Sequence, residues 1–254
     1  MKTPENQRNR DIAAYSAMYE AVSFEPVQAA LRKREILRFV RQWQPKHVLE
    51  VGCGMDPLFM HYEGFRHFTV VEPSQRFAAH ARLLAGQRQG IEIIEDFIEQ
   101  AVAQHGLASQ GYDCILVSSL IHEVADPLSI LKAVRACATP RTRIHVNVPN
   151  ARSVHRLLAF EMGLINDIHA HSARQKSLQQ HHTFDSSSLR ALVEEAGFVV
   201  REEGSYFIKP FTHDQMQQLQ QAGILSDAML DGLMRLEKYM PGLGSEIFVN
   251  LGLK

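Results

Sequence analysis

The amino-acid sequence predicts an α/β fold built on a doubly wound, mostly parallel sheet, and three observations support this prediction. Short apolar runs alternate with segments of helical periodicity from residue 44 to residue 205, which is the pattern of successive strand–helix–strand units. The run at 113–117 is almost continuously apolar, as expected for a parallel strand buried on both faces. A Gly-x-Gly turn directly follows the first run, as in sheets that bind a ligand at the carboxyl ends of their strands.

The predicted elements follow from these patterns in chain order. Apolar residues recur at helical spacing over residues 11–43, and Pro26 is expected to divide this segment into two helices. The glycine turn at 52–54 is expected to lead into a helix. Asp185 is a predicted helix N-cap and Gly197 a predicted helix end. Strands are predicted at 48–51, 69–72, 91–94, 113–117, 143–148, 199–205 and 246–251, and helices at 75–85, 128–138, 153–164, 187–196 and, as a mostly helical insertion, 212–239.

Composition and charge narrow the class of protein. The 254 residues are 45% hydrophobic and 22% charged, with a net charge of −1, so no excess charge favours nucleic acid or an anionic membrane as a partner. The three cysteines form neither a CxxC pair nor an even-numbered disulfide framework, which favours a reducing compartment. Because the sequence also lacks a secretory signal and an apolar run of about 18 residues, it predicts a cytoplasmic protein.

Three successive strands are each followed by residues that suit a nucleoside ligand. Gly52-Cys53-Gly54 follows the first strand, and glycine lets the backbone approach a ligand closely. Glu72 ends the second strand, where a carboxylate can accept hydrogen bonds from both ribose hydroxyls. Asp96 follows the third strand, where it can accept from an adenine amino group with Phe97 beside the ring. Each acid alone could be a solvated loop residue, but three loops in register favour a ligand site.

This pattern of E-x-G-x-G, then an acid after each of the next two strands, resembles the class I S-adenosylmethionine-dependent methyltransferases, particularly the small-molecule branch. The resemblance covers residues 44–148 and returns at 184–205, within HHTFDSSSLRALVEEAGF. It implies a seven-stranded sheet with an antiparallel last strand, S-adenosylmethionine as cofactor and S-adenosylhomocysteine as product. The cofactor residues that it implies are Glu50, Gly52, Cys53 and Gly54 at the methionine part, Glu72 and Pro73 at the ribose, Asp96 and Phe97 at the adenine, and Ser118 and Ser119 near the methyl group.

One position departs from the family pattern. Many members carry a third glycine two residues after Gly54, where this sequence has Asp56 followed by Pro57. An acid at this point would repel a pyrophosphate, which argues against a dinucleotide site. S-adenosylmethionine has a sulfonium cation and no phosphate, so an acidic pocket suits it better.

Three histidines are candidates for the catalytic base. His122 lies in the loop after the fourth strand, which in the resembling enzymes borders both the methyl group and the substrate, and its imidazole could take a proton from an attacking hydroxyl or amine. The alternative is that His122 packs against the cofactor or caps a helix. His181 and His182 precede the last core helix, where either could be the base or bind an anionic substrate group. With the histidines at 169 and 171 their spacing is a weak metal pattern, and the sequence predicts no metal site.

Further candidates lie near the amino end of the chain and after the predicted fifth and sixth strands. Tyr15 and Tyr19 are four residues apart on one helical face. In the resembling enzymes an amino-terminal helix often folds over the cofactor, which implies that a tyrosine hydroxyl could reach its carboxylate, although core packing is the more common use of such a pair. Weaker candidates for the substrate side follow strands five and six: Arg152, His155, Tyr206 and Lys209.

The sequence therefore predicts methyl transfer to an oxygen or nitrogen of a small acceptor, such as a sugar, a nucleotide-linked intermediate or a secondary metabolite. Residues 1–43 are expected to form a helical lid on a methyltransferase domain at 44–254, with insertions at 149–183 and 210–243. Histidines and arginines in these lid segments favour an anionic acceptor. The alternatives are an RNA or protein methyltransferase, which the near-neutral charge disfavours, and a non-catalytic cofactor-binding module. Monomer and homodimer both remain open.

Overall fold

The computed structural model describes residues 12, 23–171, 175 and 180–254. Within these ranges, seven strands and a series of helices account for nearly every predicted element. The strands are β1 His47–Val51, β2 His67–Val71, β3 Ile91–Ile94, β4 Cys114–Ser118, β5 Arg143–Pro149, β6 Phe198–Tyr206 and β7 Glu246–Leu253. The helices are α2 Glu25–Trp43, α3 Gln75–Ala85, α4 Ile98–Gln104, α5 Pro127–Cys137, α6 Val154–Glu161, α8 Ser186–Glu195, α9 His213–Gln221 and α10 Asp227–Arg235, with short 3-10 helices η2 Leu58–Met60, η3 Leu107–Ser109 and η4 Leu236–Tyr239. None of the described helices is long and apolar enough to cross a membrane.

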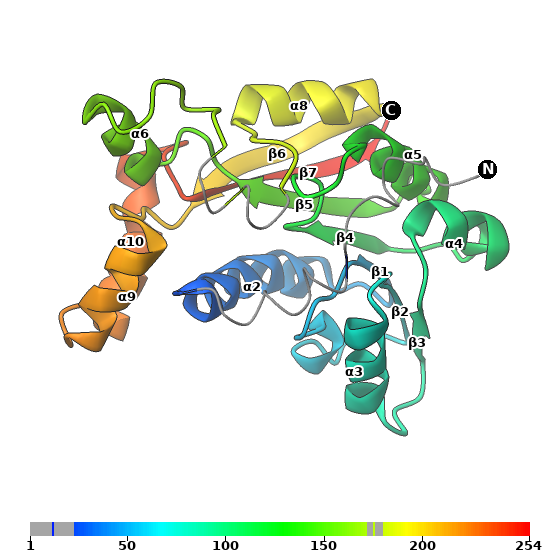
Figure 1. The fold of residues 1–254 in the computed structure, drawn as a ribbon. Coiled ribbons are helices and arrows are strands. Elements are labelled where there is room, and N and C mark those ends of the chain that lie inside the picture. Colours follow the sequence, from blue (N-terminus) through cyan, green and yellow to red (C-terminus); the bar gives the residue numbers. More distant parts are fainter. Residues whose placement is uncertain (1–11, 13–22, 172–174, 176–179) are drawn as a thin grey trace.

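The strands of the described chain form one sheet in the order β3-β2-β1-β4-β5-β7-β6. Strand β7 pairs antiparallel with β5 and with β6, and the other neighbouring strands are parallel. The fold class that the sequence predicts, with an antiparallel last strand, is therefore confirmed (Figure 1).

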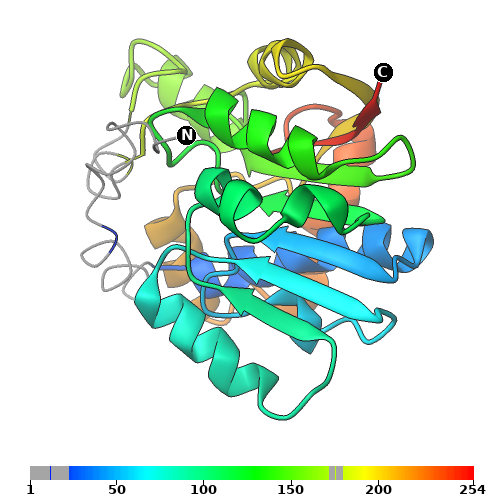
Figure 2. The same cartoon turned by 90° about the vertical axis from the view of Figure 1, so that its right-hand side faces the viewer.

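The sheet is covered on both faces, because alternate residues of its central strands join different cores. Leu49 and Val51 of β1 belong to a cluster that includes side chains of α4, α5 and α8. Val48, which precedes Leu49, belongs to a second cluster that includes side chains of α2, η2 and α3. Figures 1 and 2 show α4 and α5 across one face of the sheet and α2 on the other. Two-sided burial explains why the central strands are apolar at nearly every position.

A third core attaches the predicted helical insertion to the end of the sheet formed by β6 and β7. Phe24 and Phe39 of the α2 region pack with Phe207, Phe248 and apolar residues of α9 and α10. Thr212 caps α9 by accepting from the N–H of Gln215 at 3.3 Å, and α10 follows it after a short turn. Helices α9 and α10 consequently lie beside the amino end of α2 (Figure 1).

The helix expected after the glycine turn is absent from the described structure, and this prediction was wrong. The chain instead makes the single 3-10 turn η2 before it reaches β2. Pro57 has an extended backbone, with φ −61° and ψ 144°, and Leu58 and Phe59 are fully buried below the turn. The N–H of Leu58 donates to the buried carboxylate of Glu50 at 3.0 Å, which holds the loop down where a helix would otherwise begin.

Several loops lie together at one edge of the sheet, the edge formed by the carboxyl ends of its parallel strands. The parallel strands β1, β2, β4 and β5 all end at this edge, so the loops after them are neighbours. Strand β7 runs in the opposite direction and therefore begins there, with Glu246 beside Pro149 at the end of β5. The end of β6 comes to the same edge, because Tyr206 pairs with Glu246.

Candidate functional site

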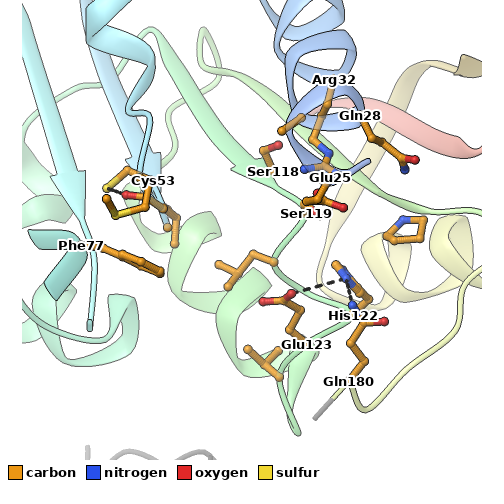
Figure 3. A pocket seen from close by; sticks show the side chains of 18 of the residues that line it. Glu25, Gln28, Arg32, Cys53, Phe77, Ser118, Ser119, His122, Glu123 and Gln180 are labelled. Atoms are coloured by element: carbon orange, nitrogen blue, oxygen red, sulfur yellow. Dashed lines mark hydrogen bonds and ion pairs between the residues drawn. The ribbon is translucent and has the colours of Figure 1, made fainter. Parts of the chain in front are cut away.

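A cavity of about 630 Å³ opens at this edge of the sheet, within the size range of small-molecule sites. The loops after β1, β2, β4 and β5 line it, together with α2 and the segment that precedes α8. Figure 3 shows Cys53 and Phe77 at one side of the cavity and Gln28 and Arg32 at the opposite side, with His122 below. The cavity therefore extends from the glycine turn to the amino-terminal half of α2, which carries Gln28 and Arg32.

Most of the predicted site residues come together around this cavity. Asp96 is an exception: it does not line the cavity, and its Oδ1 accepts from the N–H of Phe97 at 2.8 Å. Tyr15 and Tyr19 lie outside the described residues. The predicted residues that do line the cavity are Glu50, Gly52, Cys53, Gly54, Glu72, Pro73, Phe97, Ser118, Ser119, His122, His181 and His182.

The glycine turn and Glu72 form one hydrogen-bonded unit. Gly52 and Gly54 have φ values of +76° and +56°, a conformation that a side chain disfavours. The Glu72 carboxylate accepts from the N–H groups of Cys53 at 3.0 Å, Gly54 at 3.4 Å and Ser74 at 2.9 Å. Burial raises the pKa of Glu72, and these N–H groups offset part of that rise. A carboxylate offers about four lone-pair sites, so Glu72 still has capacity to accept from a ligand in the cavity.

Glu50 is a buried acid at the base of the turn, connected to α2 through the loop that follows. Burial raises its pKa to about 8, although the N–H of Leu58 and the charge of Lys33 act in the other direction. Lys33, from α2, forms an ion pair with Asp56 and also donates to the Asp56 carbonyl at 3.1 Å. Asp56, which follows the glycine turn, thus ties α2 to that turn.

Replacing Glu50 by glutamine is expected to change how stability depends on pH. The ordinary pKa of this side chain is 4.5, and burial raises it to about 8 in the folded chain. Between these values the folded chain binds the extra proton, so its free energy of unfolding falls as pH rises, by at most about 1.4 kcal/mol per pH unit. Glutamine cannot titrate. Urea unfolding at pH 5, 6, 7 and 8 should therefore show Glu50→Gln gaining stability relative to the wild type as pH increases.

The matched control is Glu92→Gln, because Glu92 is exposed on the edge strand β3. Its difference from the wild type should stay constant over the same pH series. A constant difference for Glu50→Gln as well would mean that Glu50 is ionised in the folded protein throughout this range, contrary to the prediction.

The loop after β4 brings the three predicted histidines together. His122 is 2% exposed, and its carbonyl accepts from the N–H groups of both His181 and His182 at 3.0 Å. Ser119, in the same loop, has a φ of +51°, and such backbone strain in a non-glycine residue is characteristic of functional sites. The segment before α8 is thereby fixed against the loop after β4 at the cavity wall.

The imidazole environments distinguish these histidines chemically. Nε2 of His182 lies 3.3 Å from the Ala125 carbonyl, which requires a proton on that nitrogen. Nε2 of His122 lies 3.1 Å from the Gln180 amide nitrogen, a donor, and 3.8 Å from Glu123 Oε1. Because Gln180 donates, Nε2 of His122 carries no proton in this arrangement. If it gains one, the carboxylate of Glu123 lies close enough to stabilise the imidazolium charge. His181 is exposed at the rim.

Sequence reasoning missed a buried polar cluster at the far end of the cavity. Glu246 accepts from Arg32 Nε at 2.8 Å, Gln28 Nε2 at 3.1 Å, Asn147 Nδ2 at 2.9 Å and the Tyr206 hydroxyl at 2.8 Å. The available signal was Gln28 and Arg32, two polar residues four apart on the otherwise apolar face of α2. The Phe77 and Glu123 side chains on the cavity wall were also missed.

Some of the weaker candidates from the sequence line the cavity and others do not. His155 and Lys209 line the cavity, whereas Arg152 is exposed outside it. The Tyr206 hydroxyl is turned inward to Glu246. In the described part of the chain, histidine, cysteine, aspartate and glutamate form no group of three or more that could hold a metal ion.

Comparison with protein families gives a match over residues 25–203, more than half of the chain, to the family described as "Methyltransferase domain". A comparison with curated protein sequences gives no match. Of these two sequence comparisons, the family match is therefore the one that relates this chain to known proteins.

Solved structures with the same fold include several methyltransferases. The plantazolicin methyltransferase BamL, in complex with a triazolic desmethyl analogue of plantazolicin and S-adenosylhomocysteine, aligns with a TM-score of 0.61 at 14% identity over 97% of this chain and 92% of its own. A possible histamine N-methyltransferase from Thermotoga maritima aligns with a TM-score of 0.59 at 18% identity over 95% and 99%. The N-methyltransferase NodS from Bradyrhizobium japonicum aligns with 0.54 at 10% identity over 88% and 86%. At these identities the likeness shows a shared fold.

Proposed function

The chain belongs to the methyltransferase-domain family, and we propose that it transfers the methyl group of S-adenosylmethionine to an oxygen or nitrogen atom of a small, anionic acceptor. The observation that carries this proposal is the single cavity that contains both the glycine turn with Glu72 and the buried imidazole of His122. Donor and acceptor bound at these two places would share one enclosed space. Two structural neighbours support the same class of reaction: BamL was solved with an analogue of plantazolicin, and NodS is an N-methyltransferase.

The residues at the glycine-turn end fit the cofactor chemically. S-adenosylmethionine carries a sulfonium and an ammonium group and no phosphate, and the cavity wall here carries the acids Glu50 and Glu72. Glu72 would accept from a ribose hydroxyl with the one lone-pair site that its three backbone contacts leave. Phe77 and Phe97 would flank the adenine, and binding of the amino group of the methionine part beside Glu50 would favour release of the proton that burial keeps on this side chain.

The cofactor supplies a methyl group that is already activated for in-line displacement, so the protein must mainly align the acceptor and remove its proton. Alignment in a closed cavity can supply about 7–11 kcal/mol of the barrier reduction. We assign proton removal to Nε2 of His122, whose lone pair would exchange the Gln180 N–H for the proton of the acceptor, and the imidazolium would form beside the carboxylate of Glu123 at 3.8 Å. His181 and His182 would close the rim above it.

The lid segments complete the proposal. Residues 1–43, 149–183 and 210–243 would cover the pocket of the core domain and select the acceptor. His155, Arg156 and Lys209 line the cavity on this side, which supports an acceptor with negative charge. Localisation in the cytoplasm stays a prediction.

The first test is calorimetric titration of the protein with S-adenosylmethionine and S-adenosylhomocysteine. Micromolar binding is expected for the wild type, and Glu72→Ala should weaken it by about 10–100-fold, because hydrogen bonds to a charged group contribute about 1.5–3 kcal/mol. Glu72→Gln keeps the shape of the side chain and removes its charge. Comparing it with Glu72→Ala therefore separates the effect of the lost charge from the effect of a disrupted glycine turn. Glu195→Ala, at an exposed position on α8, should bind as the wild type does.

A protein that binds neither compound, or that binds NAD in their place, would overturn the proposal. Where binding is found, methyl-labelled S-adenosylmethionine is then incubated with a panel of small amines, phenols and sugars, some with and some without a carboxylate. Transfer to RNA or protein in parallel incubations, and to no small molecule, would move the enzyme to one of those classes.

A further inference from the structure

Helix α6 is mostly apolar, yet none of its residues is buried. Its sequence is VHRLLAFE, whereas every other α-helix in the described part of the chain buries at least one side chain. Figure 1 shows α6 at the periphery of the fold, beyond the end of β5. Most helices in proteins owe their stability to the packing of an apolar face, so the uncovered face of α6 indicates a surface that another molecule covers.

Exposed apolar side chains are concentrated at this helix and at the turn that ends it. The exposed fractions are 42% for Leu158, 41% for Phe160, 62% for Met162 and 69% for Leu164. These are four of the eleven large apolar side chains that are exposed in the described residues, and they lie within seven positions of one another. Single exposed apolar side chains are ordinary, whereas a contiguous group marks a binding surface.

Polar contacts hold α6 in place. Arg156 Nε donates to the carbonyl of Ile168 at 3.0 Å, and Arg156 Nη2 donates to the carbonyl of Ala170 at 2.7 Å. The N–H of Val154 donates to the carbonyl of Leu243 at 3.2 Å. These contacts fix the first turn of the helix and leave the apolar side chains farther along it available to a ligand.

The exposed apolar side chains continue a face of α6 that begins in the cavity. His155 lines the cavity, and Leu158 and Met162 follow it three and seven residues later, on the same side of the helix. Met162 keeps helical backbone angles, with φ −77° and ψ −5°. Side chains on a helix lean toward its amino end, so Leu158 and Met162 lean toward His155. At 1.5 Å per residue they form a stripe about 10 Å long that leads away from the cavity.

The size of the cavity favours the methyl acceptor as the molecule that covers this stripe. A cavity of about 630 Å³ is in the range that one ligand of drug size fills, and S-adenosylmethionine is already such a ligand. An acceptor bound beside it therefore has its reacting end in the cavity, and any longer part continues outside. A second copy of the chain fits less well, because a stable protein interface takes about 20–30 residues from each partner.

We propose that the stripe formed by Leu158 and Met162, with Phe160 and Leu164 beside it, binds an apolar chain or ring of the methyl acceptor, while the reacting end of the acceptor lies in the cavity. The inference rests on the proposed function and narrows its substrate class to amphipathic molecules. Such a molecule has a polar reacting end joined to an apolar part that is too long for the cavity. Sugars and small polar metabolites without an apolar part would be poor acceptors.

The test titrates protein saturated with S-adenosylhomocysteine with butanoate, hexanoate, octanoate and decanoate, which share a head group and differ in chain length. Calorimetry is expected to show affinity rising about two- to fourfold for each methylene that reaches α6, because a fully buried methylene contributes a factor of about four. In the double variant Leu158→Ser, Met162→Ser the rise should stop at the shorter chains. The matched control is Met60→Ser, Leu83→Ser, which removes two exposed apolar side chains elsewhere and should leave the whole series unchanged.

A direct readout comes from the Met162 methyl group. In protein labelled with ¹³C at the methionine methyl groups, the Met162 signal is assigned by its loss in Met162→Leu. Decanoate is expected to shift this signal and butanoate to leave it in place. The signal of Met60, which is 40% exposed and does not line the cavity, should respond to neither.

Binding of S-adenosylhomocysteine to each variant shows that it is folded and keeps the two proposals apart. If the wild type binds S-adenosylhomocysteine but chain length has no effect, or if the Leu158→Ser, Met162→Ser protein keeps the full rise, the acceptor stripe is wrong and the methyltransferase proposal stands. A dimer in sedimentation analysis that this double variant dissociates would assign the stripe to a second copy of the chain and equally contradict the inference. Failure of the wild type to bind S-adenosylhomocysteine would remove the proposed function itself, and the inference with it.

Discussion

Glu246→Ala is expected to lower the free energy of unfolding by about 3–5 kcal/mol, because it removes one partner of a buried ion pair and leaves the other without its main counter-charge. Glu246 is fully buried and receives hydrogen bonds from four side chains on α2, β5 and β6. Removing it would leave Arg32, which is 8% exposed, and the three other donors without this acceptor. Urea unfolding followed by circular dichroism at pH 7 measures the loss.

An exposed ion pair on the same helix provides the control. Arg34, also on α2, pairs with Asp231 at the surface, where both side chains are almost half exposed. Exposed pairs contribute about 0–1 kcal/mol, so Arg34→Ala should change stability little. Glu246→Gln keeps the shape and some acceptor capacity and should fall between the two. A Glu246→Ala protein as stable as Arg34→Ala would show that Arg32 is adequately compensated by its 3.3 Å contact with Glu25.

The stability contribution of Glu246 also has a predictable pH dependence. Burial acts to raise its pKa, but Arg32 and the other donors hold the pKa below the ordinary value of 4.5. A carboxylate with a lowered pKa contributes stability above its unfolded-state pKa and loses that contribution as pH falls through its folded-state pKa. The difference between the wild type and Glu246→Gln should therefore be constant above about pH 5 and shrink in more acidic solution.

The sequence predicted the sheet and many residues that line the candidate site, because these features depend on local signals. Strand β3 and helix α3 have the predicted bounds, and Asp185 caps α8 as expected. The glycine turn and Glu72 are neighbours in space because Gly52 N–H donates to the Val71 carbonyl at the end of β2. Such placement follows from strand order alone, since strands β1 and β2 are adjacent and parallel.

Features that depend on distant contacts could not be predicted in the same way. The Arg32–Glu246 pair joins residues 214 positions apart, and nothing near either residue indicates the other. The helix expected after the glycine turn was wrong because burial of Leu58 and Phe59 against the sheet, with Glu50 binding the Leu58 N–H, outweighs the usual strand-to-helix pattern. Asp96 follows its strand as predicted, but its carboxylate accepts from the N–H of Phe97 instead of facing the cavity.

His122→Asn is expected to reduce kcat for methyl transfer by about 10²–10⁴-fold, the usual contribution of a positioned general base, while affinity for S-adenosylhomocysteine stays close to that of the wild type. Asparagine retains a polar group beside Gln180 but cannot accept a proton at neutral pH. Initial rates with the acceptor found in the labelled-methyl screen measure the effect. His105→Asn, at an exposed position after α4, is the control.

The pH profile separates a base from a residue that only shapes the cavity. A base works in its unprotonated form, so kcat of the wild type should fall on the acidic side, and this fall should disappear with the residue that causes it. His182 is held as a donor to the Ala125 carbonyl and His181 is exposed, so His181→Asn and His182→Asn should keep the acidic fall. If the fall persists in His122→Asn and vanishes in one of these two variants, that histidine is the base and His122 has a positioning role. If it persists in all three, none of these histidines causes it, and the assignment of proton removal to His122 is wrong.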